Sequence, residues 1–152
     1  MAGSGALRSL SLWIGAAWAM SLTTLGFFVV PMLFANLPSP AIAGGMAARL
    51  FTVQTAISAV CALALLMTFR LEKLAPNTPV IPSCTLLAIG GALLALLVEF
   101  GVSPHIVARD NLALWHSLGS TMYFAQWVCA LVVFGKLANA ASAPPAGSEV
   151  QV

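Results

Sequence analysis

The chain has 152 residues, of which 61% are apolar and 7% are charged, and its formal net charge is +2. A soluble domain of this size carries about 25% charged residues, so the composition excludes a soluble globular protein and favours a chain dissolved in lipid. The net charge is too small to indicate binding to nucleic acid, and the length leaves no room for a second globular domain.

Four apolar runs are long enough to cross a bilayer, which takes about 20 helical residues for about 30 Å of hydrocarbon. The runs cover about residues 9–34, 40–69, 83–102 and 112–137. Ser39 and Pro40 give the second run an N-cap and a first helical proline, and Pro104 follows the third run. We expect an all-α fold, with one antiparallel four-helix transmembrane bundle in residues 1–138. The tail, 139–152, is small, polar and contains prolines, so we expect it to be disordered and cytoplasmic.

The first run has a second interpretation as a signal peptide, because Arg8 precedes it and Ala17-Trp18-Ala19 resembles a cleavage site. It continues to Phe34, however, which is longer than the roughly 7–15 apolar residues of a signal peptide. We therefore expect the first helix to remain part of the protein.

The basic residues predict the orientation of the helices, since cytoplasmic loops of membrane proteins are enriched in Lys and Arg. A cytoplasmic N-terminus would place the larger group of basic residues inside. That group is Arg8, Arg70, Lys73 and Lys136, and the outer group is Arg49 and Arg109. We expect both termini to be cytoplasmic and the protein to be integral to a bacterial plasma (inner) membrane.

Glu99 is the one carboxylate inside any of the four apolar runs. An acid in hydrocarbon costs several kcal/mol unless it is paired or neutralised. Small residues at four-residue spacing mark helix-packing faces, Gly15 and Ala19 in the first helix and Gly91 and Ala95 in the third. Glu99 is the next step after Gly91 and Ala95, so we expect it to face the interior of the bundle.

Polar side chains in the fourth run form a seam at helical spacing, which consists of His116, Ser120, Tyr123 and Gln126. We expect the seam to meet Glu99, because the third and fourth helices form one hairpin that turns on the outer side. Arg49 stands near the outer end of the second helix, with Gln54 about one turn or more below it. The candidate polar intramembrane cluster, in the outer half of the bundle, is therefore Arg49, Gln54, Glu99, His116, Ser120 and Tyr123.

Two roles for this cluster stay open. It can be a static network, with an Arg49–Glu99 ion pair and His116, that fixes helix register. It can also be functional, with Glu99 and His116 exchanging protons or binding a cation or a small polar solute. A haem or metal at His116 is a weaker alternative, since the other histidine, His105, lies in a loop. The cysteines are Cys61, Cys84 and Cys129. None of them forms a CxxC pair, which argues against a zinc site or a disulfide framework.

Two segments carry a family pattern, LWIGAAWAMSLTTLGFFVVPMLFANLPSPAIAG at 12–44 and ALWHSLGSTMYFAQ at 113–126. The positions concerned are Trp13, Gly15, Pro31, Phe34, Leu37-Pro38, Ala43-Gly44, His116 and Tyr123. They resemble the transmembrane protein 205-like proteins, the family built on domain of unknown function 4149, over about residues 10–137. Gly119 stands where that pattern has a serine, with Ser120 beside it. The resemblance implies a four-helix integral membrane protein of unassigned molecular activity and no catalytic residues.

Haem-dependent protoporphyrinogen oxidases of similar length share part of the opening pattern, but they place a haem-ligating histidine early in the first helix. Here Ser9-Leu10-Ser11-Leu12 contains none. We therefore expect a non-enzymatic protein without cofactor or metal, either a small transporter-like unit or an accessory subunit. Its partners would be the lipid bilayer, further copies in a homo-oligomer or a larger membrane complex, and a small polar solute or cation. The alternative is a haem-binding membrane oxidoreductase of the protoporphyrinogen oxidase type.

Overall fold

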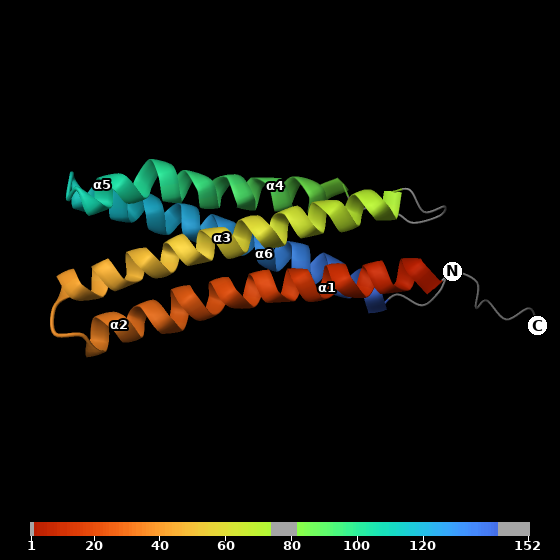
Figure 1. Cartoon of the computed structure of the whole chain (residues 1–152), viewed down its shortest axis with the longest axis horizontal. Coiled ribbons are helices and arrows are strands. Elements are labelled where there is room, and N and C mark those ends of the chain that lie inside the picture. Colours follow the sequence, from red (N-terminus) through yellow and green to blue (C-terminus); the bar gives the residue numbers. More distant parts are fainter. Residues whose placement is uncertain (1, 74–81, 143–152) are drawn as a thin grey trace, which may run out of the picture.

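The computed structural model describes residues 2–73 and 82–142, and every regular element in these two ranges is a helix (Figure 1). The helices line up in four rods, each long and apolar enough to cross a membrane. The rods are α1 (Ala2–Thr23), η1 (Thr24–Val29) and α2 (Val30–Asn36); α3 (Pro40–Lys73); α4 (Pro82–Leu97), η2 (Val98–Val102) and α5 (Ser103–Val107); and α6 (Leu112–Ser142). The all-helical fold predicted from the sequence is confirmed, as are four helical segments with the length and apolar composition of membrane spans.

Several helices extend further than the sequence predicted. The third rod continues through Pro104 to Val107, because a proline in the first turn of a helix needs no N–H donor there. The second reaches Lys73 and the fourth reaches Ser142, so the expected tail is helical in 139–142. Alanines, which favour helix, supply this last turn. The rest of the expected tail, and the segment 74–81, lie outside the described residues. At the start of α3, Ser39 is the cap that was expected, since its Oγ accepts a hydrogen bond from the Ile42 N–H at 3.4 Å.

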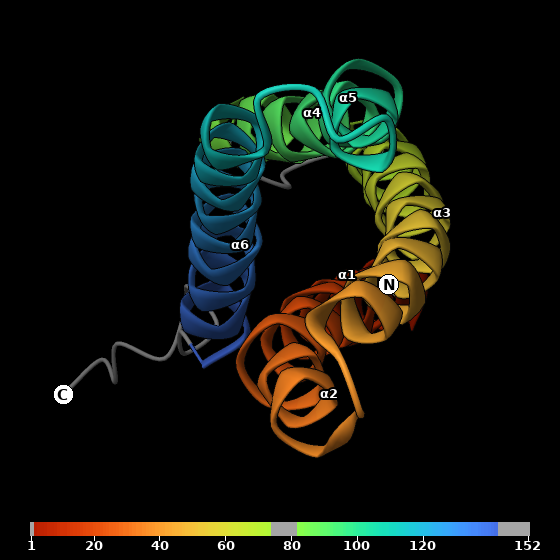
Figure 2. The ribbon, with the colours of Figure 1, turned by 90° about the vertical axis from the view of Figure 1, so that its left-hand side faces the viewer.

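Each rod packs on two neighbours. α1 contacts α3 and α6, and α4 contacts the same two helices, so the cyclic order is α1, α3, α4, α6 (Figure 2). The start of α1 and the end of α6 lie at one end of the molecule, where Arg8 and Ala141 line the same small cavity. We call this the closed end, and we call the end that holds α2 and α5 the open end.

Large apolar side chains fill the interior from the middle of the molecule to the closed end. Trp18, Leu22, Leu65 and Val133 are fully buried there, and they come from three different rods. Gly91 of α4 lets the Trp18 ring approach, because a Cβ at this glycine would lie 2.6 Å from the ring. The small residue therefore leaves room for the Trp18 ring to reach α4, which lies opposite α1 in the bundle.

Two π-helical segments lie toward the open end, and a proline follows each. The Val30 N–H bonds to the Leu25 carbonyl, and the Ser103 N–H bonds to the Val98 carbonyl, five residues back in both cases. Pro31 and Pro104 come directly after these donors. A proline has no N–H and its ring clashes with the carbonyl four residues earlier, so the preceding turn widens from α to π.

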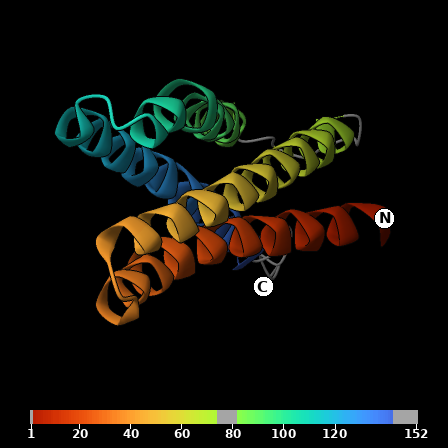
Figure 3. The ribbon, with the colours of Figure 1, turned by 60° about the vertical axis from the view of Figure 1, so that its left-hand side comes forward.

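Beyond these segments the two helical hairpins diverge. α2 packs on α3 and α5 packs on α6, and the two pairs move apart toward the open end (Figures 1 and 3). Among the described side chains, neither α2 nor α5 has a buried residue. The buried residues of α6 are Gly119, Gln126, Ala130 and Val133. The large buried side chains thus lie from the middle of the molecule to the closed end, while the buried residues of α3 toward the open end are the small Ala43 and Ala47.

Candidate functional site: polar groups inside the membrane spans

A layer of uncharged polar side chains joins three helices near the middle of the molecule. Gln54 of α3 donates to the Oγ of Ser21 in α1 at 3.0 Å and lies 3.4 Å from the Oγ of Ser58. Gln126 of α6 donates to the same Ser58 oxygen at 2.8 Å. Both glutamines are buried. Interhelical hydrogen bonds of this kind contribute about 0.6 to 2 kcal/mol each, so this layer fixes the register of α1, α3 and α6.

Tyr123 of α6 inserts its hydroxyl into the hydrogen-bond ladder of the first rod. The hydroxyl donates a hydrogen bond to the Leu22 carbonyl at 2.7 Å. The hydroxyl oxygen in turn accepts a hydrogen bond from the Gly26 backbone N–H. In an α-helix the Gly26 N–H would bond directly to the Leu22 carbonyl. A side chain placed between the two groups opens the ladder, and η1 begins at this point. Gly26 is required for the approach, because a Cβ there would lie 2.6 Å from the Tyr123 ring.

Glu99 lies in the first turn of the π-helical segment η2. It is half-buried and its Oε1 accepts a hydrogen bond from the Thr52 hydroxyl of α3 at 2.8 Å. The Arg49–Glu99 ion pair, which was one of the two alternatives, does not form: across residues 2–73 and 82–142, the ion pair that the structure contains is His105 with Asp110, at 3.5 Å. Arg49 is exposed instead. Glu99 therefore meets a neutral hydroxyl, and its charge is not balanced by a described basic side chain.

His116 and Ser120 are both exposed, on the stretch of α6 that leads from Tyr123 toward the open end. The structure therefore distributes the six residues of the expected cluster among three surroundings. Gln54 and Tyr123 belong to partly buried contacts between rods, Glu99 pairs with Thr52, and the exposed residues are Arg49, His116 and Ser120. The physical reason is the divergence of the hairpins, which moves the start of α6 away from α2 and α3.

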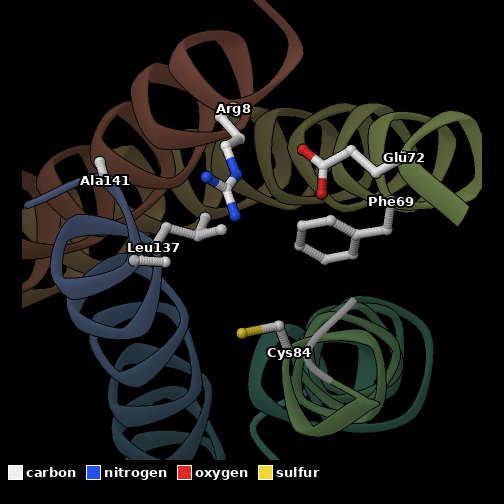
Figure 4. A pocket seen from close by; sticks show the side chains of 7 residues that line it. Arg8, Phe69, Glu72, Cys84, Leu137 and Ala141 are labelled. Carbon is white, nitrogen blue, oxygen red and sulfur yellow. The ribbon is translucent and has the colours of Figure 1, made fainter. Parts of the chain in front are cut away.

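The carboxylate that the sequence did not single out is Glu72, near the closed end. It is 6% exposed, and its Oε1 lies 3.5 Å from the Ser11 hydroxyl, which is also 2.9 Å from the Thr68 hydroxyl. Glu72 borders a cavity of about 30 Å³, into which Arg8 also extends (Figure 4). The second helix was expected to end at Phe69, so Glu72 was placed in a loop. Helical spacing from Leu65 through Thr68 could have shown that it continues a buried face.

The turn between α5 and α6 is held by aromatic stacking. The His105 ring lies parallel to the Trp115 ring with 4.0 Å between the centroids, and Arg109 and Asn111 have positive φ values of 58° and 34°. Within the part of the chain that the structure describes, no three His, Cys, Asp or Glu side chains are grouped so that they could hold a metal ion. The cysteines of the described ranges are free thiols.

Comparison with known proteins identifies a family. The family model for a domain of unknown function (DUF4149) matches residues 9–113, which is more than half of the chain. No curated protein and no solved structure matches the chain. The matched stretch holds Glu99 and Thr52, whereas Tyr123 and Gln126 lie beyond it.

Proposed function

The chain belongs to the DUF4149 family and is a multi-pass membrane protein, and from this premise we propose that it is a small, non-enzymatic transporter-like unit. In this proposal it binds a small cation at Glu99, reached from the open end. We further propose that the chain is one of the transmembrane protein 205-like proteins, on the basis of the resemblance in its first and fourth helices.

The observation that carries the proposal is the environment of Glu99. A carboxylate inside a spanning helix is expensive, and such groups commonly line paths for ions or substrates. This one lies in a π-helical segment, an irregularity that is frequent at functional sites. Its described hydrogen-bond donor is the single hydroxyl of Thr52, so one carboxylate oxygen can still accept a ligand. A cation suits this oxygen better than a neutral solute, because it also neutralises the charge.

The uneven packing of the interior supports access from one side. The half toward the closed end is filled by Trp18, Leu65 and Val133, while α2 and α5 have no buried side chain among the described residues. We place the closed end in the cytoplasm, in line with the excess of basic residues there, and the open end outside a bacterial plasma (inner) membrane. One copy encloses little volume, so passage across the membrane would take several copies.

An accessory subunit is the second candidate, and the exposed polar groups of α6 favour it. His116 and Ser120 lie in a helix that is long and apolar enough to span a membrane, yet both are exposed. Polar groups at membrane depth require partners, which another membrane protein could supply. A stable complex isolated from native membranes, together with absence of cation binding, would favour this candidate.

The haem-binding oxidoreductase remains the alternative from another class. Its iron ligands would have to include His105 or His116, and the first of these is stacked on Trp115 and lies near Asp110. An optical spectrum of the purified protein tests it, because a Soret band would overturn the non-enzymatic proposal.

Isothermal titration of the protein in lipid nanodiscs tests the proposed function. The probes are sodium, potassium and tetramethylammonium chlorides, and the variants are Glu99→Gln and, as control, Glu72→Gln at the other end. We expect saturable binding of at least one cation by the wild type and the control, and its loss in Glu99→Gln. No binding by the wild type, or equal binding by Glu99→Gln, would overturn the proposal.

A further inference from the structure

The groups around Glu99 supply only oxygen atoms as described ligands. The Glu99 carboxylate and the Thr52 hydroxyl are 2.8 Å apart, on neighbouring rods. The Thr52 hydroxyl has a second acceptor, since the Ala48 carbonyl lies 3.3 Å from it. It can therefore turn its proton to Ala48 and present its lone pairs to a cation held by Glu99. Hard cations are the ions that prefer such oxygen ligands.

The backbone of the same segment provides a further oxygen. In a regular helix each N–H serves one carbonyl, and the Ser103 N–H already serves Val98. Pro104 comes next and has no N–H, so one carbonyl four or five residues before it, that of Phe100 or Glu99, loses its helical donor. In broken membrane helices, freed carbonyls of this kind coordinate ions.

The charge balance selects a monovalent ion. One carboxylate neutralises one positive charge, and a divalent ion would leave an excess charge in a medium of low dielectric constant. The nearest basic residue along α3 is Arg49, three residues before Thr52, and it is exposed and forms no ion pair with Glu99 within the described ranges.

We propose that Glu99, Thr52 and the backbone carbonyl freed by Pro104 form a site for one monovalent alkali cation. This inference rests on the proposed function and names its ligand class, sodium or potassium in place of an organic ammonium ion. When the ion binds, the Thr52 O–H turns its proton from the Glu99 carboxylate to the Ala48 carbonyl. The oxygen atoms of Thr52, Glu99 and the backbone carbonyl can then all coordinate the ion.

The test titrates sodium chloride and potassium chloride into protein in nanodiscs, with N-methylglucamine chloride holding the ionic strength constant. Thr52→Val keeps the shape of the side chain but removes the oxygen, and Pro104→Ala restores an N–H for the freed carbonyl. We expect each variant to bind about tenfold or more weakly than the wild type, as for loss of one good polar contact. Thr52→Ser, which keeps the hydroxyl, should bind as the wild type does.

Thr121→Val is the matched control, because its hydroxyl bonds to the Ser117 carbonyl of its own helix, away from Glu99. It should bind the cation normally, and size-exclusion profiles identify any variant that fails to fold. Wild-type affinity in both Thr52→Val and Pro104→Ala would overturn the inference. Glu99-dependent binding of tetramethylammonium without binding of sodium or potassium would refute the alkali site and leave the proposed function standing. No cation binding at all would overturn both.

Discussion

Two glycines decide how closely aromatic rings approach neighbouring helices. Gly91 faces the Trp18 ring and Gly26 faces the Tyr123 ring, and at each position a Cβ would lie 2.6 Å from a ring carbon. The Trp18 ring is fully buried and borders several rods, so it has no free volume into which to retreat. The absence of a side chain at Gly91 is therefore as important for packing as the Trp18 ring itself.

We predict that Gly91→Ala destabilises the protein, whereas Gly90→Ala does not. Overpacking a core costs about 1 to 3 kcal/mol, and that cost outweighs the gain of up to about 1 kcal/mol from replacing a helical glycine. The neighbouring Gly90 has open space where a Cβ would stand, so its substitution keeps the gain alone. Thermal unfolding in detergent measures both variants. Equal melting temperatures for the two would contradict the role assigned to Gly91.

The two carboxylates show what can be predicted residue by residue. The spacing after Gly91 and Ala95 predicted that Glu99 faces the interior of the bundle; in the structure Glu99 is half-buried and reaches Thr52 of the neighbouring rod. It could not indicate the partner, because the choice between Arg49 and Thr52 depends on side-chain positions on another helix. Glu72 was missed for a different reason. A helix end placed four residues too early turned a buried acid into a loop residue.

The π-helical segment η1 has two causes, one local and one distant. Pro31 removes a donor, and the Tyr123 hydroxyl stands between Leu22 and Gly26. The effect of Pro31 can be predicted from the sequence, because a proline acts within its own helix. The insertion of Tyr123 could not be predicted in this way, since it requires the packing of α6 against α1. The continuation of the third rod past Pro104 was missed because a proline starts a helix as readily as it ends one.

We predict that Tyr123→Phe changes hydrogen exchange at the Gly26 amide. Without the hydroxyl, Gly26 loses its bridging partner and Leu22 its donor, which costs about 1 to 3 kcal/mol for buried groups left unpaired. The matched control is Trp127→Phe, which removes the 2.9 Å bond from the indole to Thr23 in the same pair of helices without touching the ladder. Mass spectrometry after exchange should show faster exchange at Gly26 in the first variant alone. Equal exchange in both variants would contradict the insertion of the hydroxyl into the ladder.

Across the whole molecule, composition and run length were sufficient to predict four spans, since each span is set by its own residues. The difference in packing between the two ends was not predictable in the same way. It goes with the π-helical segments before Pro31 and Pro104, with the contact of Tyr123, and with the uneven distribution of large side chains such as Trp18. These causes act between rods, so no single run of sequence contains them.

We predict that the two ends of the molecule react from opposite sides of the membrane. In a background without the native cysteines, Val107→Cys at the open end should react with an impermeant maleimide in intact cells. Asn139→Cys near the closed end should react only after lysis, because the excess of basic residues places that end in the cytoplasm. Both positions are exposed, so accessibility within the protein does not distinguish them. The reverse pattern would overturn the orientation and place the Glu99 site on the cytoplasmic side.

The bond from Tyr123 to Leu22 joins residues 101 positions apart. Ribosomes make the first span long before the last, so the first rod enters the bilayer while the hydroxyl that completes its ladder has not been synthesised. The nascent first span therefore lacks this partner for Leu22 and Gly26 until α6 arrives. Maturation of this protein thus includes a late step in which α6 completes the hydrogen bonding of a helix that is already in the membrane, and a chain truncated before α6 leaves that step undone.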